Sequence, residues 1–354
     1  MKKILVIDDS ALMRRVMSDI INSTKEYKVT YTAINGIEGL TILEEHSDIV
    51  AVFCDVMMPQ MNGLELLQVV KRKNINVPFI MFSSSEETSD TLTALELGAI
   101  EFIKKPERIL GTTNEFFERR VINALNIASD IKEKMDSNSF ETHDKVVSVS
   151  NSHNKKNASS NGNHKLVALV CSTGGPKALQ YVIPKLPKNL AAPVLVVQHM
   201  PAGFTDTLAA RLNDLSEISV KEAEDGEPIK NGVVYIAKGG THLTLCEEKG
   251  TPVIRFDDSP PVVGLKPCGN IMYNSLCDLS YDEIVCVVLT GMGADGTKGI
   301  MELSNHKDIY VIAQDEKSST VYGMPRAVHE RGLTDCVCDI NHVAKEITKK
   351  VGVL

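Results

Sequence analysis

Three aspartates directly follow apolar segments that have the character of buried strands. Asp8 and Asp9 follow residues 4–7, and Asp55 follows residues 49–54. In an open parallel sheet, the residues just past the carboxyl ends of the strands meet in one crevice. Carboxylates that meet there repel one another unless a cation neutralises them, and Mg²⁺, a hard ion with oxygen ligands, suits such a site. Asp55 could then act as a nucleophile towards a phosphoryl group while the metal screens the charge.

Two more polar side chains stand at the ends of neighbouring apolar segments. Ser83 ends the segment that begins at residue 79, and its hydroxyl could bond a phosphoryl oxygen. Lys105 follows residues 102–103, where a lysine can bind a phosphate as a point charge. Each of these residues by itself is as well explained as a helix cap, a loop residue or a solvated surface cation. All five at the ends of successive strands favour a phosphoryl-accepting site.

A second set of residues has the types needed for acyl transfer. Ser172 follows the apolar run 166–171 and precedes Gly174 and Gly175. A strand–glycine turn–helix junction exposes a side chain and aims backbone N–H groups at the same space, which favours a developing negative charge. His199 ends the run that begins at residue 194 and could serve as a general base, and Asp295 could accept the imidazole N–H and fix its tautomer.

Each member of this second set also has a plainer explanation. Ser172 by itself is better explained as a turn or cap residue. His199 is equally well explained as a hydrogen-bonded loop histidine, and a helix N-cap is the commoner use of an aspartate such as Asp295. Two glycine-rich motifs are absent from the Ser172 turn: the GxxxxGK[ST] phosphate loop and the GxSxG nucleophile elbow. The order serine, histidine, aspartate is no objection to a triad, because triads are defined by geometry.

The elements that must position these residues follow from hydrophobic periodicity. In the first part of the chain, strand-like and helix-like segments alternate. The expected strands are residues 4–7, 29–33, 49–54, 79–82 and 102–103; after a first helix that begins behind Ser10, the expected helices are residues 37–45, 64–73, 87–97 and 115–134. Five strands alternating with five helices imply a parallel sheet covered on both faces.

A second parallel α/β sheet is expected from about residue 165 onward. Four strand-like runs, LVALVC, VLVVQH, IVCVVLTG and IYVIAQ, have helical patterns between them. Between residues 233 and 257 the pattern changes to alternating strands, with a hairpin turn at Lys249-Gly250. The fold class is therefore predicted as α/β: a (βα)5 domain with a parallel sheet, then a doubly wound α/β domain with a small antiparallel hairpin.

The stretch 137–163 separates the two parts. It is rich in Ser, Asn, Lys and His and has almost no large apolar residues, so it cannot bury enough surface to offset the entropy of ordering. We interpret it as a flexible linker and expect no catalytic role for His143, His153 or His164. The predicted domains are residues 1–125, a helix end and linker at 126–164, and residues 165–354.

Composition narrows the class of protein. The chain has 354 residues, enough for two domains, and a formal net charge of −8, which argues against nucleic acid as the main partner. Eight cysteines without a CxxC pair favour a reducing cytoplasm over a disulfide framework. The apolar run behind the N-terminus is too short for a signal peptide, and no apolar stretch approaches the roughly 20 residues that span a bilayer.

The motifs of the first part resemble the response-regulator receiver family over residues 1–125. They are IDDS, CDVMMPQMNG, FSSS and FIKKP, in that order. The resemblance implies that Asp55 is the phospho-acceptor and that a histidine kinase is the phosphodonor. It also implies that Asp8 and Asp9 are the acidic magnesium pair and that the backbone carbonyl of Met57 is a further ligand.

The same resemblance implies a switch. Ser83 and Phe102 correspond to the hydroxyl and aromatic switch positions of the family. Our hypothesis is that the unphosphorylated receiver covers the active site of the second part, and that phosphorylation shifts these two residues and opens it.

The motifs of the second part resemble the chemotaxis protein-glutamate methylesterase family from residue 166 to the C-terminus. They are CSTGGPKAL, VVQHMPAGFT, LTGMGADGTKG and AQDEKSSTVYGMPRAV. The resemblance implies that Ser172 is the nucleophile, His199 the base and Asp295 the residue that orients the base. We take the backbone amides of Thr173 and Met292 as hypothetical oxyanion donors.

The implied reaction is hydrolysis of glutamate methyl esters on the cytoplasmic helices of methyl-accepting chemoreceptors, with deamidation of glutamine at such sites. Both proceed through an acyl-serine intermediate and need no cofactor in the catalytic domain. Contact with the membrane would come only through the receptors, and a monomer is the simplest expectation.

Two places depart from the methylesterase pattern. Lys238 stands where the family usually has proline, although His242 behind it is retained, as a groove residue or a structural one. After Pro260-Pro261, residues 262–270 replace a His-Arg-Pro-Ser-Val-Asp-like segment. The departure leaves the three acyl-transfer residues in place but keeps a rival open, a non-catalytic receptor-binding module. A transcription regulator is a weaker rival, because no helix-turn-helix pattern or basic cluster is present.

Overall fold

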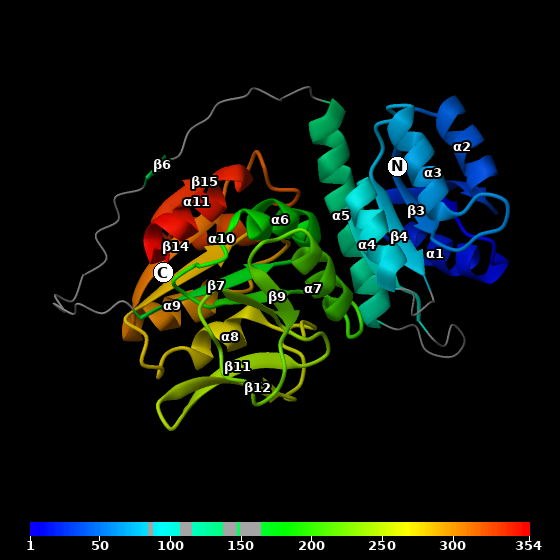
Figure 1. The fold of residues 1–354 in the computed structure, drawn as a ribbon. Coiled ribbons are helices and arrows are strands. Elements are labelled where there is room, and N and C mark those ends of the chain that lie inside the picture. Colours follow the sequence, from blue (N-terminus) through cyan, green and yellow to red (C-terminus); the bar gives the residue numbers. More distant parts are fainter. Residues whose placement is uncertain (84–87, 107–114, 137–146, 149–163) are drawn as a thin grey trace. The chain divides into compact units, whose positions relative to one another are not determined.

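The computed structural model describes residues 1–83, 88–106, 115–136, 147–148 and 164–354. The chain divides into two compact units, Met1–Thr142 and His143–Leu354, which we describe one at a time (Figure 1). Among the described helices, none is long and apolar enough to cross a membrane.

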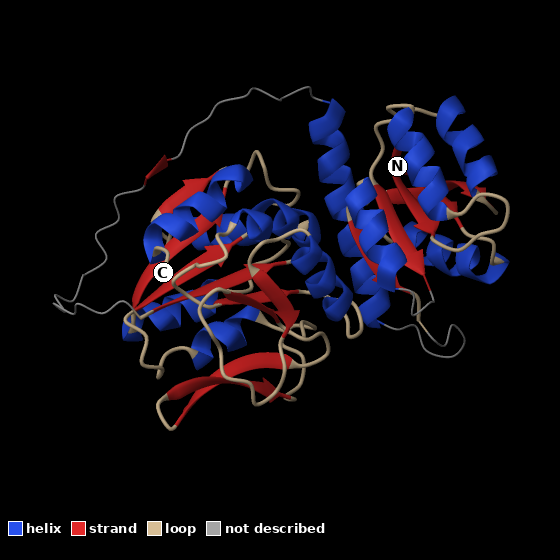
Figure 2. Cartoon of the chain, in the orientation of Figure 1, coloured by secondary structure: helices blue, strands red, loops and turns tan. Residues whose placement is uncertain are grey.

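The first unit is a five-stranded parallel sheet with helices on both faces (Figure 2). The strand order is β2-β1-β3-β4-β5, so the chain reverses direction across the sheet between β1 and β3. The strands are β1 (Lys2–Ile7), β2 (Tyr27–Ala33), β3 (Ile49–Asp55), β4 (Phe79–Ser83) and β5 (Glu101–Lys104). The helices are α1 (Ala11–Ser23), α2 (Gly36–Glu45), α3 (Gly63–Arg72), α4 (Thr88–Leu97) and α5 (Glu115–Asp136). The predicted parallel sheet of five strands is confirmed.

Side-chain caps set where three of these helices begin. Ser10 accepts from the amide of Met13 at the start of α1, and Asn35 accepts from the amide of Glu38 at the start of α2. At the start of α3, Asn62 forms a reciprocal capping box with Glu65. Each cap therefore fixes where the chain turns from the carboxyl end of β1, β2 or β3 into the next helix.

The second unit is built on an eight-stranded sheet in the order β6-β15-β14-β13-β7-β8-β10-β9. All strands run parallel except the edge strand β6. The strands are β6 (Val147–Ser148), β7 (Lys165–Cys171), β8 (Val194–Gln198), β9 (Ser219–Glu222), β10 (Val233–Ile236), β13 (Glu283–Val288), β14 (Asp308–Gln314) and β15 (Cys336–Cys338). The central strands β7, β8 and β13 are almost wholly buried, as their continuous apolar sequences require.

Helices and a separate hairpin complete this unit. The helical segments are α6 (Gly175–Val182), the 3₁₀ turn η1 (Ile183–Lys185), α7 (Thr205–Asp214), α8 (Gly269–Ser275), α9 (Thr297–His306), α10 (Gly323–Glu330) and α11 (Ile340–Val351). The strands β11 (His242–Glu248) and β12 (Thr251–Asp257) form an antiparallel pair. The hairpin turn expected at Lys249-Gly250 is confirmed.

Two sequence-based expectations need correction. Residues 233–236 do not belong to the antiparallel insertion: they form β10, which pairs in parallel with β8 and β9, because Val234 and Ile236 are buried in the main sheet. Within the stretch interpreted as a linker, Val147 and Ser148 pair with the edge of β15. The remaining linker residues, with His143 and His153, lie outside the described part of the chain.

Candidate active site

In the first unit, the three predicted aspartates converge at the carboxyl ends of β1 and β3. One carboxylate oxygen from each of Asp8, Asp9 and Asp55 lies within 4.8 Å of the others. Asp8 and Asp55 are buried, whereas Asp9 is exposed. The Nζ atom of Lys105 lies 2.7 Å from Asp8 Oδ2 and 2.7 Å from Asp55 Oδ2. The lysine therefore joins the crevice, as its place behind β5 predicts.

The crevice contains more negative than positive charge, so it can accommodate one more cation. Burial raises the pKa of Asp55 to about 6, although Lys105 beside it acts in the opposite direction, and the charges of Asp8 and Asp9 add to the rise. One ammonium group thus faces three carboxylates. Three oxygen donors in a partly buried, net negative site suit a hard divalent ion such as Mg²⁺.

The two predicted switch residues lie on the adjacent strands β4 and β5. Ser83 is buried at the end of β4, where its carbonyl accepts a 2.9 Å hydrogen bond from the amide of Lys105. Phe102 is buried on β5. The loop that carries Met57 folds back onto β3 because Gly63 has no side chain: a Cβ atom there would lie 2.1 Å from the carbonyl oxygen of Asp55.

In the second unit, backbone pairing extends past the strands and brings the predicted acyl-transfer residues together. The amide of His199 donates to the carbonyl of Cys171 at 3.1 Å, so His199 lies beside the end of β7. The amide of Ser172 donates to the carbonyl of Thr290 at 3.0 Å, which draws the loop after β13 against the same point. Since the chain leaves β7 towards β8 and returns at β13 on the other side, Ser172 lies at the switch point of the sheet.

His199 and Asp295 form a direct hydrogen bond. Nε2 of His199 lies 2.8 Å from Oδ2 of Asp295, and both side chains are buried. Nδ1 of His199 is buried and has no hydrogen-bond partner among the residues that the structure describes. With Asp295 accepting the Nε2 hydrogen, Nδ1 is the nitrogen left to accept a proton. The hydroxyl of the neighbouring Ser172 does not bond to it in this structure.

Asp295 receives three further hydrogen bonds from one segment. The amides of Gly269 and Asn270 donate at 2.5 Å and 3.0 Å, and Sγ of Cys268 lies 3.1 Å from Oδ1. Burial acts to raise the pKa of this carboxyl, but the hydrogen bonds from His199, Gly269 and Cys268 outweigh it and hold the pKa at about 2. Asp295 is therefore ionised at neutral pH.

The turn after Ser172 leaves no room for side chains at Gly174 and Gly175. Gly174 has a left-handed backbone with φ 77°, and a Cβ atom on Gly175 would lie 1.9 Å from Oε1 of Gln198. The hydroxyl of Thr290 donates to the carbonyl of Thr173 at 2.9 Å, which ties this turn to the loop that carries Met292. The two amides predicted as oxyanion donors thus belong to two loops that touch at Ser172.

Sequence reasoning missed the segment that holds Asp295. Cys268, Gly269 and Asn270 lie in the stretch 262–270 that departs from the methylesterase pattern, yet they contact the carboxylate. These residues lie far from Asp295 in the sequence, and hydrophobic periodicity reports only on local structure. The sequence therefore shows no sign of the contact. The two other positions singled out make plain contacts: Lys238 pairs with Glu222 at 3.7 Å, and buried His242 has Nε2 3.3 Å from the carbonyl of Pro260.

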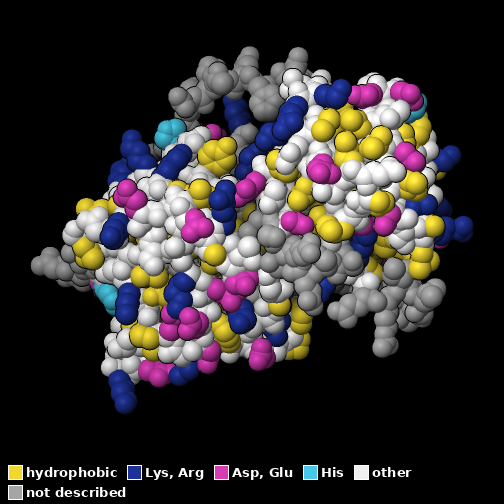
Figure 3. All heavy atoms as spheres, turned by 45° about the vertical axis from the view of Figure 1, so that its right-hand side comes forward, with side chains coloured by type: hydrophobic (Ala, Val, Ile, Leu, Met, Phe, Trp, Pro, Cys, Tyr) yellow, Lys and Arg dark blue, Asp and Glu magenta, His cyan; other side chains and the backbone are white. Residues whose placement is uncertain are grey.

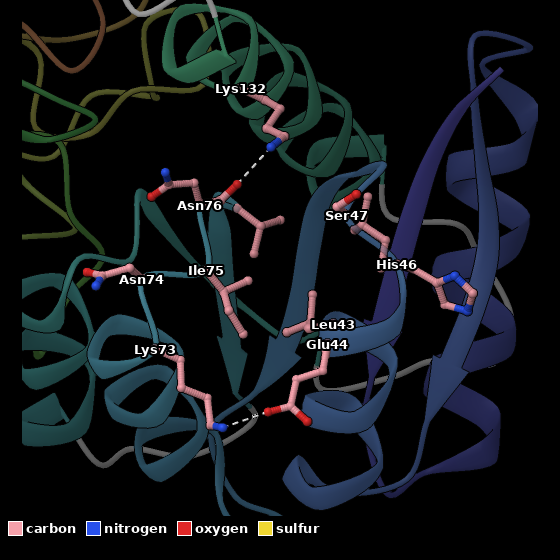
Figure 4. Close-up of a pocket in the computed structure, with 11 residues that line it drawn as sticks. Leu43, Glu44, His46, Ser47, Lys73, Asn74, Ile75, Asn76 and Lys132 are labelled. Atoms are coloured by element: carbon pink, nitrogen blue, oxygen red, sulfur yellow. Dashed lines mark hydrogen bonds and ion pairs between the residues drawn. The ribbon is translucent and has the colours of Figure 1, made fainter.

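A hollow of about 530 Å³ lies elsewhere, near the amino ends of β3 and β4 (Figure 4). Nζ of Lys73 lies 2.8 Å from Glu44, and Nζ of Lys132 donates to the carbonyl of Asn76 at 2.8 Å. Both lysines of the lining are thus already paired. Because Asp55 ends β3 at the opposite edge of the sheet, we assign this hollow no part in the chemistry.

The visible surface carries both signs of charge. On the face in Figure 3, Lys and Arg side chains are interspersed with Asp and Glu, and no extended basic surface is seen on that face among the described residues. This distribution agrees with the acidic composition and gives a nucleic-acid backbone no continuous track there.

Comparison with known proteins covers both units. A family model described as "CheB methylesterase" matches residues 167–347, and one described as "Response regulator receiver domain" matches residues 4–112. A relative from Geobacillus kaustophilus, named protein-glutamate methylesterase/protein-glutamine glutaminase, is 38% identical over 99% of this chain and 99% of its own. The chain belongs to the CheB methylesterase family.

Other members agree with this assignment. A CheB relative of the same name from Bacillus subtilis is 38% identical over 99% of this chain and 99% of its own. The solved CheB catalytic domain of Thermotoga maritima is 41% identical with a TM-score of 0.51, and the match covers 53% of this chain and 98% of that one. The predicted family and the predicted fold class are confirmed. The non-catalytic alternative is not favoured, because these CheB relatives are named as enzymes.

Proposed function

We propose that this chain is a protein-glutamate methylesterase, with protein-glutamine glutaminase activity, that is regulated by phosphorylation of its receiver domain. The observation that carries the proposal is the buried His199–Asp295 pair beside Ser172, in which Nδ1 of His199 has no partner among the described residues. An Nδ1 without a partner in the described part of the chain is also found on buried His242 and on His342, but of the three only His199 lies beside Ser172 and pairs with Asp295, so its Nδ1 is suited to a hydrogen bond that forms during the reaction.

This geometry supports the following mechanism. Oγ of Ser172 attacks the ester carbonyl and gives its proton to Nδ1 of His199, while Asp295 stabilises the imidazolium through Nε2. The C–O bond to the methoxy group breaks, and methanol leaves with the proton from His199. Water, activated by the same histidine, then cleaves the acyl-serine and releases a glutamate side chain. With a glutamine substrate, ammonia leaves instead of methanol.

The developing oxyanion needs preorganised donors. We assign this role to the backbone amides of Thr173 and Met292, because they belong to the two loops that touch at Ser172. The position of Thr173 next to the start of α6 adds the favourable end of a helix dipole.

In the receiver, Asp55 is the proposed phospho-acceptor. Asp8, Asp9, Asp55 and the carbonyl of Met57 would hold Mg²⁺, which when bound neutralises charge on the carboxylates and the incoming phosphoryl group. Lys105 already lies against Asp55 and would pair with the phosphoryl oxygens.

Ser83 and Phe102 are the proposed switch residues. Both are buried on adjacent strands of the receiver, so a hydroxyl drawn towards a phosphoryl group would disturb the packing around the ring. We propose that this rearrangement relieves inhibition of the esterase domain.

The proposed cellular setting follows from the family. The substrates are methyl-accepting chemoreceptors, the phosphodonor is a chemotaxis histidine kinase, and the protein works in the cytoplasm as a monomer without a cofactor in its catalytic domain. It meets the membrane only through receptors and does not bind nucleic acid. The proposed domains are residues 1–125, a helix end and linker at 126–164, and residues 165–354.

Methanol release from methyl-esterified receptor tests the function. With a small-molecule phosphodonor and Mg²⁺, the wild type should release methanol, and Ser172→Ala should lower the rate at least about 1000-fold, because the nucleophile is lost. Ser304→Ala, at a half-buried serine of α9 whose hydroxyl donates only to the carbonyl of Met301 among the described residues, is the matched control and should keep the wild-type rate. Equal rates for Ser172→Ala and wild type would rule out the proposed nucleophile.

A further inference from the structure

Helix α8 begins directly against the Asp295 carboxylate. The residue before the helix, Cys268, is 1% exposed, and its Sγ lies 3.1 Å from Oδ1 of Asp295. The amide of Asn270 also donates to Oδ1, while Oδ2 receives the amide of Gly269 and Nε2 of His199. Each carboxylate oxygen therefore has two donors, and the one on which catalysis depends is Oδ2.

Cys268 does not cap its own helix. It occupies the N-cap position with an extended backbone, φ −126° and ψ 128°, but its side chain makes no hydrogen bond to the first turn of α8. Asp295, from the loop before α9, accepts the first two amides of α8 in its place. The thiol is thereby released from the usual capping role and points at the carboxylate.

The close approach depends on the residue after the cysteine. A Cβ atom on Gly269 would lie 2.7 Å from Cγ2 of Val170 and 3.1 Å from Oδ2 of Asp295. A glycine at this position allows the start of α8 to reach the carboxylate. The Cys268 thiol therefore lies at Oδ1 of Asp295, and the Gly269 amide lies at Oδ2.

The protonation states of Cys268 and Asp295 decide which of the two groups donates the hydrogen bond. The hydrogen bonds to Asp295 keep the carboxyl ionised, since its pKa is held at about 2. Burial, with the charge of Asp295 and the hydrogen bond to it, raises the pKa of the Cys268 thiol to about 12. Across the neutral range the thiol donates and the carboxylate accepts.

A buried cysteine is most often only a small apolar side chain. Here the thiol lies against the Asp295 carboxylate, a full negative charge from which water is almost excluded. Because water cannot replace a lost hydrogen-bond donor there, each protein donor contributes to stabilising the charge. Without the thiol, Oδ1 would keep one donor, and the carboxylate could rotate away from the geometry that holds Oδ2 on His199. A loss of orientation affects the turnover number more than substrate binding.

We propose that Cys268 is a positioning residue of the esterase, whose thiol holds Oδ1 of Asp295 so that Oδ2 stays on Nε2 of His199. This inference rests on the proposed function, because it assigns Cys268 a part in the same reaction. It applies to the resting protein as well, because the contact is formed without substrate.

Steady-state methanol release by full-length variants tests the role in catalysis. Cys268→Ala should lower kcat about tenfold with KM nearly unchanged, because a hydrogen bond to a charged group is lost. Cys268→Ser restores a donor and should recover kcat to within about threefold of wild type. Cys277→Ala, a half-buried cysteine just past the end of α8, is the control and should keep the wild-type kcat. A wild-type kcat for Cys268→Ala, or Cys268→Ser as slow as Cys268→Ala, would overturn the proposal.

Infrared spectroscopy tests the contact without activity. The difference spectrum between wild type and Cys268→Ser isolates the S–H stretching band of this thiol, which a carboxylate acceptor lowers in frequency. The same band, isolated in an Asp295→Asn background, should move back to higher frequency. A band that stays in place on Asp295→Asn would overturn the proposal even if the kinetics agreed. Failure of the wild type to release methanol would instead count against the proposed function, and the band would still decide the contact.

Discussion

At the scale of single residues, Asp295 shows how a charge can be held where water is scarce. Its side chain is almost fully buried, which by itself disfavours ionisation. Four donors from His199 and residues 268–270 reverse that preference. The same donors fix the direction of the carboxylate, so ionisation and orientation have one cause.

This arrangement predicts a pH dependence of stability. The folded-state pKa of Asp295, about 2, lies below the unfolded value of about 3.9, so its contribution is present above about pH 4 and is lost as pH falls towards 2. Between about pH 5 and pH 3, the free energy of unfolding should fall about 1 kcal/mol less in Asp295→Asn than in wild type.

Urea unfolding of both proteins at the two pH values, followed by tyrosine fluorescence, measures this difference. Equal losses in the two proteins would mean that the hydrogen bonds do not hold the carboxyl ionised at low pH.

At the scale of elements, both units place polar residues at the carboxyl ends of parallel strands. The order of strands reverses beside β1 in one sheet and beside β7 in the other. A reversal opens a crevice, because the helices on the two sides of it turn away to opposite faces. Phosphoryl chemistry and acyl chemistry are thus assigned to the same kind of position in two different sheets.

Helices α8 and α9 cap each other at the proposed acyl-transfer site. Asp295, before α9, accepts from the first amides of α8, and Oδ1 of Asn270, in α8, accepts from Gly296 N at 3.1 Å and Gly299 N at 2.8 Å. Neither helix has a side-chain cap from its own N-cap residue. The two helix starts therefore depend on each other.

This dependence predicts the effect of one substitution. Asn270→Ala should lower the free energy of unfolding by about 1–2 kcal/mol, because two amides at the start of α9 lose their acceptor. Asn274→Ala, on the exposed side of the same helix, should change it by less than about 0.5 kcal/mol. Urea denaturation of both variants gives the comparison, and equal effects would contradict reciprocal capping.

At the scale of the whole molecule, the proposed function requires one unit to control the other. Asp55→Asn should keep the basal rate of methanol release, but a phosphodonor should no longer raise it, because the phospho-acceptor is gone. In wild type the same phosphodonor should raise the rate about fivefold or more. A normal response in Asp55→Asn would sink the regulatory proposal.

A second variant separates the two activities. Ser172→Ala should take up the phosphoryl group as wild type does while it releases no methanol, since the two groups of residues belong to different units. Phosphoryl uptake measured beside methanol release in the same samples gives both readouts. Loss of uptake in Ser172→Ala would show that the two activities are not separable.

The amino-acid sequence by itself determined the fold class and the polar residues at the strand ends. The reason is that apolar runs and helical spacing are local signals, and strand ends in a parallel sheet share one edge. Asp8, Asp55 and Lys105 could be placed together in this way, and so could His199 and Asp295. Their catalytic and phosphoryl roles stay predictions.

Only the tertiary structure decided which groups orient these residues. The nitrogen that His199 turns to Asp295 depends on the rotation of a ring, which no residue pattern encodes. Cys268, Gly269 and Asn270 contact Asp295 although more than twenty residues of chain separate them from it. The start of α8 fits there because Gly269, which lies beside Val170, has no side chain. Contacts of this kind arise from the packing of distant segments, and they have no counterpart in local periodicity.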